Sequence, residues 1–402
     1  ANVLQLRWYN IYQGIYFKKI GFRLILRKGE NALKVLVLGG TGDMGKRAAL
    51  DLAKRPEVEE LTITSTDLSK AKRLAQELGS KVKALQVDAN NHEALVEAMK
   101  GKDVIASAIG PFYKYEQIAV EAAIKAGVNY VSICDDFDAV ESVLPFDTKA
   151  RELGLSILTG MGWTPGISNV LAKKGADMLD EVDEINIYWA GSAADATGFA
   201  VVLHTIHIFT GKVDSFIGGK KVKVLAGSGK EKIKFLEPLG IVDMYHLGHP
   251  EPVTLPKFIP GVKTVTLKGG LVESYLNTVA IAAARLGLTN TPKKKHTIGK
   301  IMKKLLPIFE KLGKPAVPMS GIRVDIKGKL KGKAQHIVYQ AADHMDTLTG
   351  VPLAIGALML GKGQITRKGV FAPEAVVDPD IFIEALAERD IEVVCTKGLN
   401  NG

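Results

Sequence analysis

The feature that most restricts the fold of this chain is a glycine-rich segment, Gly40-x-Gly42-x-x-Gly45. A short apolar run over residues 34–38 precedes it, as is typical of a parallel strand buried on both faces. A helical stretch follows and ends at Pro56. A strand, a glycine turn and a helix in this order predict the first unit of a dinucleotide-binding fold.

Each glycine of this turn has an expected role. Gly40 permits the tight turn, Gly42 lets the main chain approach a pyrophosphate, and Gly45 lets the helix pack close to the strand. The first N–H groups of the helix are free to bind phosphate. A glycine turn without a ligand is the alternative. The cofactor-binding residues expected at this turn are Gly39, Gly40, Thr41, Gly42, Asp43, Met44 and Gly45.

The end of the second expected strand, residues 61–65, decides which dinucleotide is preferred. An acid there binds both ribose hydroxyls and repels a 2′-phosphate. This chain has Ser65 and Thr66 instead, with cationic side chains shortly after, which favours NADP over NAD. Asp67 leaves an alternative open: it is either the N-cap of the next helix or a ribose ligand that favours NAD.

The following segments alternate between strand and helix patterns as far as residue 160, and predict a doubly wound parallel sheet. Its ligand crevice lies at the carboxyl ends of the strands. Asp88 ends the third expected strand and is placed to touch the adenine. Ala108, Gly110 and Pro111 end the fourth, and we expect them to contact the cofactor as well.

Composition excludes several classes of protein. No apolar run reaches the ~18 residues of a membrane-spanning helix. The two cysteines, Cys134 and Cys395, cannot form a disulfide framework, which favours a reducing compartment such as the cytoplasm. The net charge of +10 is densest over residues 293–304, a pattern typical of the solvated face of an amphipathic helix. Nucleic acid or anionic lipid is the alternative partner, but no nucleic-acid-binding motif accompanies the cluster, so we expect neither.

Three loops at the strand ends resemble the saccharopine dehydrogenase/reductase family, including its lysine 6-dehydrogenase-like members. They read AIGPFYKY from Ala108, GVNYVSICDD from Gly127 and GMGWTPGISN from Gly160. Residues 248–256 and 369–379 also resemble the family, so the likeness covers roughly residues 34–396. The fifth-strand loop, Cys-Asp-Asp, departs from the saccharopine-cleaving pattern, so the substrate is not specified.

The resemblance implies a Rossmann domain, an inserted mixed α+β substrate and dimerisation domain, and a homodimer. It also implies NAD(P)-dependent hydride transfer at the carbon of a C–N bond, in an amino acid or an imine conjugate, and hence a role in amino-acid metabolism such as that of lysine. The expected divisions are an N-terminal extension over residues 1–32, a Rossmann domain over 33–165, a substrate domain over 166–345, and a segment over 346–402 that returns to the Rossmann domain.

Oxidation of an amine needs a group that moves a proton near neutral pH. Tyr113, Lys114 and Asp135 follow strand ends near the expected nicotinamide and are the candidate catalytic residues. Alternatively, Lys114 is solvated and Tyr115 packs on the helix. Asp136 is an expected helix N-cap, and Cys134 an expected small buried side chain.

Other polar residues of the second half have two interpretations. His204 and His207 stand three apart on one expected helix, which suits a metal, but no carboxylate or cysteine partner is evident, so we expect a histidine pair in the core or cleft and no metal. His249 and Glu251 belong to a turn or face the substrate. Arg285 and Arg323 are candidate ligands for a substrate carboxylate.

Two other functions remain open on sequence grounds. A dinucleotide-sensing module would bind the cofactor without turnover, although it has less need of the polar groups at the strand ends. A reductase of a carbon–carbon double bond would share the same cofactor half.

Overall fold

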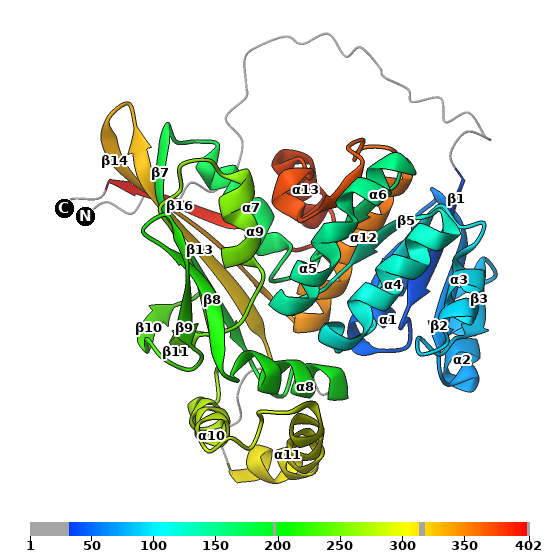
Figure 1. The fold of residues 1–402 in the computed structure, drawn as a ribbon, viewed down its shortest axis with the longest axis horizontal. Helices are drawn as coiled ribbons and strands as arrows, with labels where there is room; N and C mark the ends of the chain where they lie inside the picture. The colour runs from blue at the N-terminus through cyan, green and yellow to red at the C-terminus, as the bar shows by residue number, and fades with distance from the viewer. Residues whose placement is uncertain (1–31, 196–197, 313–317, 400–402) are drawn as a thin grey trace.

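The computed structural model of the chain describes residues 32–195, 198–312 and 318–399. Two sheets stand side by side, and helix α8 (Phe199–Ile208) lies below them, at the junction (Figure 1). The expected N-terminal extension, residues 1–32, falls almost entirely outside the described residues. None of the helices in the described ranges has the length and apolar character that crossing a bilayer requires.

The first sheet has seven strands in the order β15-β6-β5-β4-β1-β2-β3, and every pairing in it is parallel. This confirms the doubly wound sheet, whose order reverses between β1 and β4, where ligands bind in such folds. Its strands are β1 (Leu33–Leu38), β2 (Val58–Ser65), β3 (Val82–Gln86), β4 (Val104–Ser107), β5 (Asn129–Ser132), β6 (Ser156–Leu158) and β15 (Gly369–Phe371).

Helices cover both faces of this sheet because its strands carry apolar side chains on both. In β1, Val35 and Val37 join one core with the helix that follows the glycine turn, while Leu36 and Leu38 join a separate core with the helices of the opposite face. The helices of this half are α1 (Asp43–Ala53), α2 (Leu68–Leu78), α3 (His92–Met99), α4 (Phe112–Ala126), α5 (Phe137–Val143) and α6 (Asp147–Glu152), with a short 3-10 turn over Leu144–Phe146.

The second sheet has nine strands and mixed pairing, along the path β10-β11-β12-β7-β13-β14-β16, with β8 and β9 attached at β12. Parallel β7 and β12 form its centre, and β13 and β14 continue it antiparallel. Its strands are β7 (Glu181–Gly191), β8 (Lys212–Ile217), β9 (Lys220–Leu225), β10 (Glu231–Lys234), β11 (Ile241–His246), β12 (Thr264–Leu271), β13 (Ser320–Leu330), β14 (Lys333–Asp343) and β16 (Val394–Leu399).

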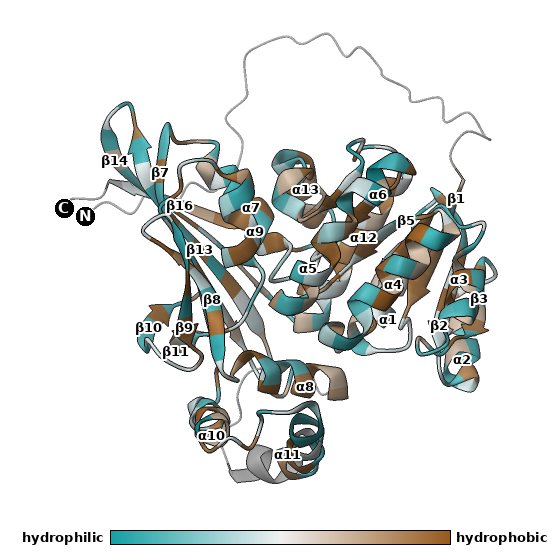
Figure 2. Ribbon diagram, viewed as in Figure 1, coloured by the Kyte–Doolittle hydropathy of each residue, from teal (hydrophilic) through white to brown (hydrophobic). Residues whose placement is uncertain are grey.

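The remaining helices connect the two sheets or extend below them. They are α7 (Ile167–Ala176), α9 (Glu251–Phe258), α10 (Ser274–Arg285), α11 (Pro292–Leu312), α12 (Met345–Gly361) and α13 (Pro379–Ala387), with a 3-10 turn over Pro373–Ala375. Helices α10 and α11 lie beneath α8 at the bottom of Figure 1. Figure 2 shows α12 as predominantly hydrophobic and much of α11 as hydrophilic, and α11 carries the basic cluster of residues 293–304.

The C-terminal segment, residues 346–402, divides between the two sheets, whereas we expected all of it to return to the Rossmann domain. Its strand β15 pairs with β6 in the Rossmann sheet, as expected. Its last strand, β16, pairs instead with β14 in the second sheet, from Gln335 opposite Leu399 to Gln340 opposite Val394. The physical reason is that β14 would otherwise leave an unpaired edge of backbone donors and acceptors, which β16 covers.

Candidate active site

The glycine turn connects β1 to α1 by a close approach of main chain to main chain. Gly39 has a φ of 71°, in the left-handed region that favours glycine, so the tight turn depends on Gly39 and not on Gly40 as predicted. A methyl group on Gly40 would lie 2.9 Å from Cβ of Ile63 on β2. A methyl group on Gly45 would lie 2.2 Å from the carbonyl oxygen of Gly39, so Gly45 lets α1 start directly against the turn.

The first turn of α1 is open to a ligand. Gly42 is the N-cap residue and supplies no side chain to the helix N–H groups. A methyl group on Gly42 would meet one protein atom within 4 Å, the carbonyl oxygen of Gly39 at 3.5 Å, so the space in front of it is not filled by packing. Uncapped N–H groups and the positive end of the helix dipole suit the pyrophosphate of a dinucleotide. Thr41, Asp43 and Met44 flank this opening on the same turn.

The end of β2 has hydroxyl groups at its tip. Thr41 Oγ1 donates to Ser65 Oγ at 2.8 Å, which joins the glycine turn to this strand end. The Asp67 carboxylate accepts the N–H groups of Ser69 and Lys70 at 3.0 and 3.1 Å, so Asp67 is the N-cap of α2, as one of the two interpretations predicted. Thr66 is exposed beside them and accepts through its carbonyl from the side chain of Gln86.

The predicted residues at the other strand ends lie in two places. Asp88 is exposed after β3, and its carboxylate accepts the N–H and side-chain amide of Asn90 at 2.9 and 2.7 Å. Ala108, Gly110 and Pro111 follow β4 and line a cavity together with Met44 from the glycine turn. The cavity therefore begins where the nicotinamide end of a dinucleotide bound at this turn would reach.

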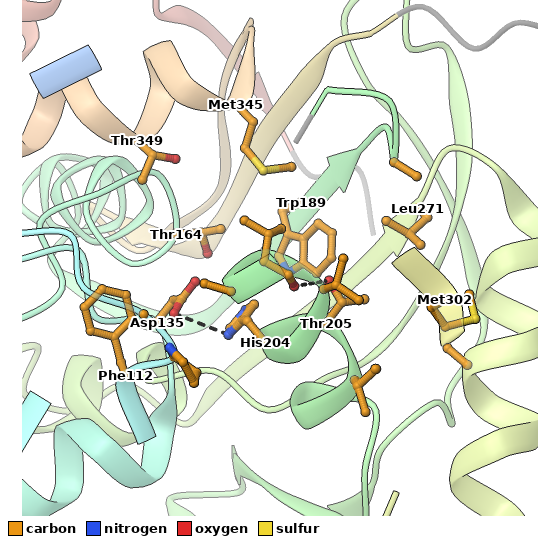
Figure 3. Close-up of a pocket in the computed structure, with 18 of the residues that line it drawn as sticks. Phe112, Asp135, Thr164, Trp189, His204, Thr205, Leu271, Met302, Met345 and Thr349 are labelled. Carbon is orange, nitrogen blue, oxygen red and sulfur yellow. Dashed lines mark hydrogen bonds and ion pairs between the residues drawn. The ribbon is translucent and has the colours of Figure 1, made fainter. Parts of the chain in front are cut away.

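This cavity of about 210 Å³ lies between the two sheets. Its walls come from the strand ends of the Rossmann sheet, from Trp163, from Trp189 on β7, and from helices α8, α10, α11 and α12. A methyl group on Gly110 would lie 3.1 Å from Cβ of Ala200, so α8 packs against the loop after β4. Figure 3 shows Asp135 and His204 at one end of the cavity and Leu271 and Met302 toward the other.

The polar end of the cavity is an ion-pair cluster. Nδ1 of His204 lies 2.8 Å from Oδ1 of Asp136 and 3.3 Å from Oδ1 of Asp135 (Figure 3 draws the contact with Asp135). The prediction that no carboxylate accompanies the histidine pair is therefore wrong for His204, because the loop after β5 reaches α8 across the sheet junction. His207 lies deeper and contacts Asp138 through Nε2 at 3.3 Å.

Asp136 stands at the N-cap position of α5 but does not cap that helix with its side chain. The carboxylate accepts the backbone N–H of Tyr113 at 2.8 Å and thus stabilises the first turn of α4 instead. Its other oxygen holds His204. Asp136 therefore acts as a cap, as expected, but of α4 and not of α5. Because the same carboxylate also binds His204, it fixes that histidine relative to the Rossmann sheet.

The three groups differ in their affinity for protons. Burial raises the pKa of Asp135 to about 7, with Asp136 adding to this effect and His204 opposing it. Burial disfavours the charged form of His204, but the carboxylates of Asp135 and Asp136 outweigh it and raise its pKa to about 9. The contacts of Asp136 with His204 outweigh burial and lower the pKa of Asp136. At neutral pH, Asp135 is therefore the member of the cluster that exchanges a proton readily.

The ligand atoms of Asp135, Asp136 and His204 lie within 4.8 Å of one another, a spacing that could hold a metal ion. A metal would need the nitrogen of His204 unprotonated. Here that nitrogen is hydrogen-bonded to a carboxylate, and the pKa of His204 is about 9. The arrangement fits a protonated imidazole between two carboxylates better than a metal centre.

His249 closes the polar end of the cavity from the second sheet. Its ring is buried and stands at 87° to the ring of His204, with centroids 5.4 Å apart. Neither nitrogen has a hydrogen bond of normal length, but Nδ1 lies 3.7 Å from Oε2 of Glu251. Burial lowers the pKa of His249, so the ring is neutral at pH 7. Of the two interpretations, a turn or a pair that faces the substrate, His249 fits the second because it lines the cavity. Glu251 does not line it; it starts helix α9 and accepts from Thr164 and Ser168 at 2.5 and 2.8 Å.

Two of the predicted catalytic residues lie outside the cavity. Tyr113 and Lys114 line a separate surface hollow between α4 and α5. The Tyr113 ring lies against His207, with centroids 4.6 Å apart, and burial raises the pKa of its hydroxyl to about 12. Lys114 is exposed and donates to the Tyr115 hydroxyl at 2.7 Å. Of the three predicted catalytic side chains, Asp135 alone lines the cavity.

The candidate carboxylate ligands also lie elsewhere. Arg323 on β13 is paired with Asp325 at 2.8 Å and with the carbonyl of Lys234 at 2.9 Å. Arg285 is exposed at the end of α10. Cys134 is buried, as predicted, and burial raises the pKa of its thiol well above the usual range, which makes it a poor nucleophile.

Sequence reasoning missed how the cavity is assembled. His204 and His249 were noticed, but their meeting with Asp135 joins residues that are 69 and 114 positions apart, and no local pattern encodes that contact. The wall from α10 and α11 was not predicted at all. An apolar stripe on α10 with a spacing of three and four residues was the available signal, but such a stripe usually indicates ordinary core packing.

Comparisons with known proteins agree with this geometry. The model of the saccharopine dehydrogenase NADP-binding domain matches residues 35–153, and that of the saccharopine dehydrogenase C-terminal domain matches residues 162–391. Carboxyaminopropylagmatine dehydrogenase from Synechocystis is 26% identical over 388 residues, which cover 89% of this chain and 96% of the relative.

Two further proteins are similar, one in fold and the other over part of its sequence. The structure of apo saccharopine dehydrogenase (L-Glu forming) from Saccharomyces cerevisiae aligns with a TM-score of 0.67 at 17% identity, over 91% of this chain and 100% of that one, and shows a shared fold. Phenylcoumaran benzylic ether reductase Betv6 from Betula pendula is 33% identical over 153 residues, or 35% of this chain and 49% of the relative.

Proposed function

The chain belongs to the saccharopine dehydrogenase family and is an NAD(P)-dependent oxidoreductase that acts at a carbon–nitrogen bond, and we propose that Asp135 is its proton-transfer residue. The observation that carries this proposal is the position of Asp135, a carboxyl group that titrates near pH 7 and lines the cavity next to the cofactor turn. A proton-transfer group works best when its pKa is close to the working pH.

Asp135, His204 and Asp136 have different proposed roles in amine oxidation. The bound dinucleotide supplies the hydride acceptor. The Asp135 carboxylate takes the proton of the substrate nitrogen as the C–N bond becomes an imine. Protonated His204, held by Asp136 at 2.8 Å, stabilises the charged form of Asp135 and keeps its side chain in place. In the opposite direction, protonated Asp135 returns the proton to nitrogen.

The residues present fit a dinucleotide, and we propose NADP as the preferred one. The main chain of Gly39, Gly42 and Gly45 would hold the pyrophosphate, and Ser65 and Thr66 would bind the 2′-phosphate side of the ribose. The Asp67 carboxylate, which would repel that phosphate if it faced the ribose, is instead engaged by the N–H groups of α2.

Three further points remain proposals from the sequence: the domain limits at residues 33–165, 166–345 and 346–402, a homodimer, and a cytoplasmic role in lysine or related amino-acid metabolism. The division of the last segment between the sheets by β15 and β16 supports moving the third limit. Light scattering of the purified protein tests the dimer.

The decisive test is a turnover assay with the dinucleotide-loaded protein. NADP is incubated with a panel of amines that includes lysine, saccharopine, polyamines and simple alkylamines, and formation of reduced nicotinamide is followed. We expect at least one amine to be oxidised. Dinucleotide binding without turnover of any amine or imine would instead identify a sensor, and turnover of a conjugated alkene alone would identify a carbon–carbon reductase.

A further inference from the structure

The cavity has one polar end and a long apolar end. Asp135, His204 and His249 form the polar end, beside the loop after β4. Toward the other end, where Figure 3 shows Leu271 and Met302, the lining is mostly apolar and includes side chains of α8, α10 and α11. The cavity is therefore built for a ligand whose two ends differ in polarity.

Helix α10 presents a continuous apolar stripe to the cavity. Leu276, Val279, Ala280 and Ala283 line it, and their spacing of three and four residues places them on one helix face. A similar pair, Ile298 and Met302, projects from α11 at a spacing of four. Together these side chains give the cavity an apolar wall.

Four of the five hydroxyl groups in the wall already have partners within the protein, and the fifth, Thr349, comes from α12 and not from α10 or α11. Thr205 Oγ1 donates to the carbonyl of Val201 at 2.9 Å, and Ser192 Oγ donates to Glu273 at 2.7 Å. Thr164 donates to Glu251, and Thr289 accepts from Thr210 at 2.8 Å. A ligand group at the apolar end would find no free hydroxyl among these.

Cations are also missing from this wall: within the described ranges, no lysine or arginine lines the cavity. Lys295 contacts Nδ1 of His207 at 2.5 Å and lies over the Tyr113 ring, and it does not line the cavity. A carboxylate placed among the α10 and α11 side chains would lose its hydration without gaining a counter-ion, which is strongly unfavourable.

We infer that the substrate carries an apolar group, an alkyl chain or an aryl ring, on the side of the molecule away from its reacting nitrogen, and that α8, α10 and α11 hold this group. The inference rests on the proposed function, because it assigns the nitrogen to the Asp135 end. It identifies the substrate class as hydrophobic amines or imines, in place of amino acids that have a charged distal end.

The test compares two amines that differ at one end. n-Hexylamine ends in a methyl group, whereas 6-aminohexanoate carries a carboxylate at that position. Binding of each to the NADP-loaded protein is measured by calorimetry. We expect hexylamine to bind at least about tenfold more tightly, and the series from butylamine to octylamine to gain about fourfold per methylene group. Equal affinity, or a preference for 6-aminohexanoate, would overturn the inference.

A pair of variants locates the apolar site. Met302→Arg places a cation in the wall, whereas Ile301→Arg places the same cation on the neighbouring position, which is 46% exposed and does not line the cavity. Met302→Arg should weaken hexylamine binding at least tenfold and improve 6-aminohexanoate binding, while Ile301→Arg leaves both unchanged. If Met302→Arg does not fold, Met302→Gln, which adds polarity at similar size, is compared with Ile301→Gln.

The outcomes separate this inference from the proposed function. If reduced nicotinamide forms with amino acids but hexylamine neither binds nor reacts, the oxidoreductase assignment stands and the apolar substrate class is wrong. If hexylamine binds as expected while Asp135→Asn leaves amine oxidation intact, the apolar site stands and the proposed role of Asp135 is wrong.

Discussion

The dinucleotide turn and the substrate cavity lie side by side but are built in different ways. The turn is one continuous segment, Gly39 to Gly45, and the groups that we propose bind the dinucleotide are main-chain atoms. The cavity collects side chains from segments as far apart as Met44 and Thr349, and its chemistry depends on side-chain identity. A site built from main-chain atoms can be recognised in the sequence by glycines at a fixed spacing. A site built from side chains of distant segments has no such local pattern.

We therefore expect substitutions in the two regions to differ in their effects on turnover and on dinucleotide binding. A change in the cavity should remove turnover and spare dinucleotide binding. A change in the turn should remove dinucleotide binding first.

The largest effect is expected for Asp135→Asn. The amide has the shape of the carboxyl group but cannot take up a proton, so the rate of amine oxidation should fall by roughly 10²–10⁴-fold. NADP affinity, measured by calorimetry, should change less than about twofold. Asp138→Asn is the control, because Asp138 follows the same strand end and pairs with His207 but does not line the cavity. A fully active Asp135→Asn protein would show that another group moves the proton.

Gly45→Ala should act on the other region. The new methyl group would lie 2.2 Å from the Gly39 carbonyl oxygen, so α1 must shift away from the turn. Overpacking of this kind destabilises the folded protein by about 1–3 kcal/mol. The displaced helix N-terminus should also weaken NADP binding, which calorimetry measures, by roughly tenfold or more. Thermal unfolding measures the accompanying loss of stability. In Gly42→Ala the methyl group clears the protein by 3.5 Å, so binding should weaken while stability is kept.

The pH dependence of turnover should come from the cavity cluster. Amine oxidation needs the Asp135 carboxylate, whose pKa is about 7, so kcat/KM should fall about tenfold per pH unit below that value. Imine reduction needs the protonated form, so its rate should fall above pH 7. His204, with a pKa of about 9, loses its proton on the alkaline side and sets a second limit for oxidation. A profile that is flat from pH 5 to 8 would rule out Asp135 as the titrating group.

A smaller change is expected for Ser65→Asp. A carboxylate at the end of β2 repels the 2′-phosphate and offers acceptors to the ribose hydroxyls, so the preference should move from NADPH toward NADH by roughly tenfold. Calorimetry with both dinucleotides measures the shift. Ser80→Asp, an exposed change beyond the other end of α2, adds the same charge and should leave the preference unaltered. A wild-type preference for NADH of tenfold or more would overturn the proposed role of Ser65.

The smallest effect is expected at Tyr113→Phe. The hydroxyl lies outside the cavity lining, and the structural contribution of Tyr113 is its backbone N–H, which donates to Asp136 at 2.8 Å and is kept in the variant. Turnover should stay within about twofold of the parent protein. A loss of a hundredfold or more would mean that α4 moves during the reaction and brings Tyr113 to the substrate.

The same difference between local patterns and distant contacts decides what could be predicted from the sequence. The parallel sheet and the glycine turn were predictable because they depend on local apolar runs and glycine spacing. The role of Asp136 was not, because a residue at the start of α5 caps α4 instead. Tyr113 and Lys114 follow the right strand end, but α4 directs both side chains into a hollow that it shares with α5, outside the cavity. The pairing of β16 with β14 depends on an edge that only the folded sheet creates.

Helix α12 joins the two regions without an intervening loop. A methyl group on Gly350 would lie 2.6 Å from the carbonyl oxygen of Met44, so the helix rests directly on the start of α1, while Met345 and Thr349 of the same helix form part of the cavity wall. Because α12 contacts α1 and also forms part of the wall, a displacement of α1 by a bound pyrophosphate would displace that wall as well. Occupancy of one region should therefore change the affinity of the other, and thermodynamic linkage makes the factor equal in both directions.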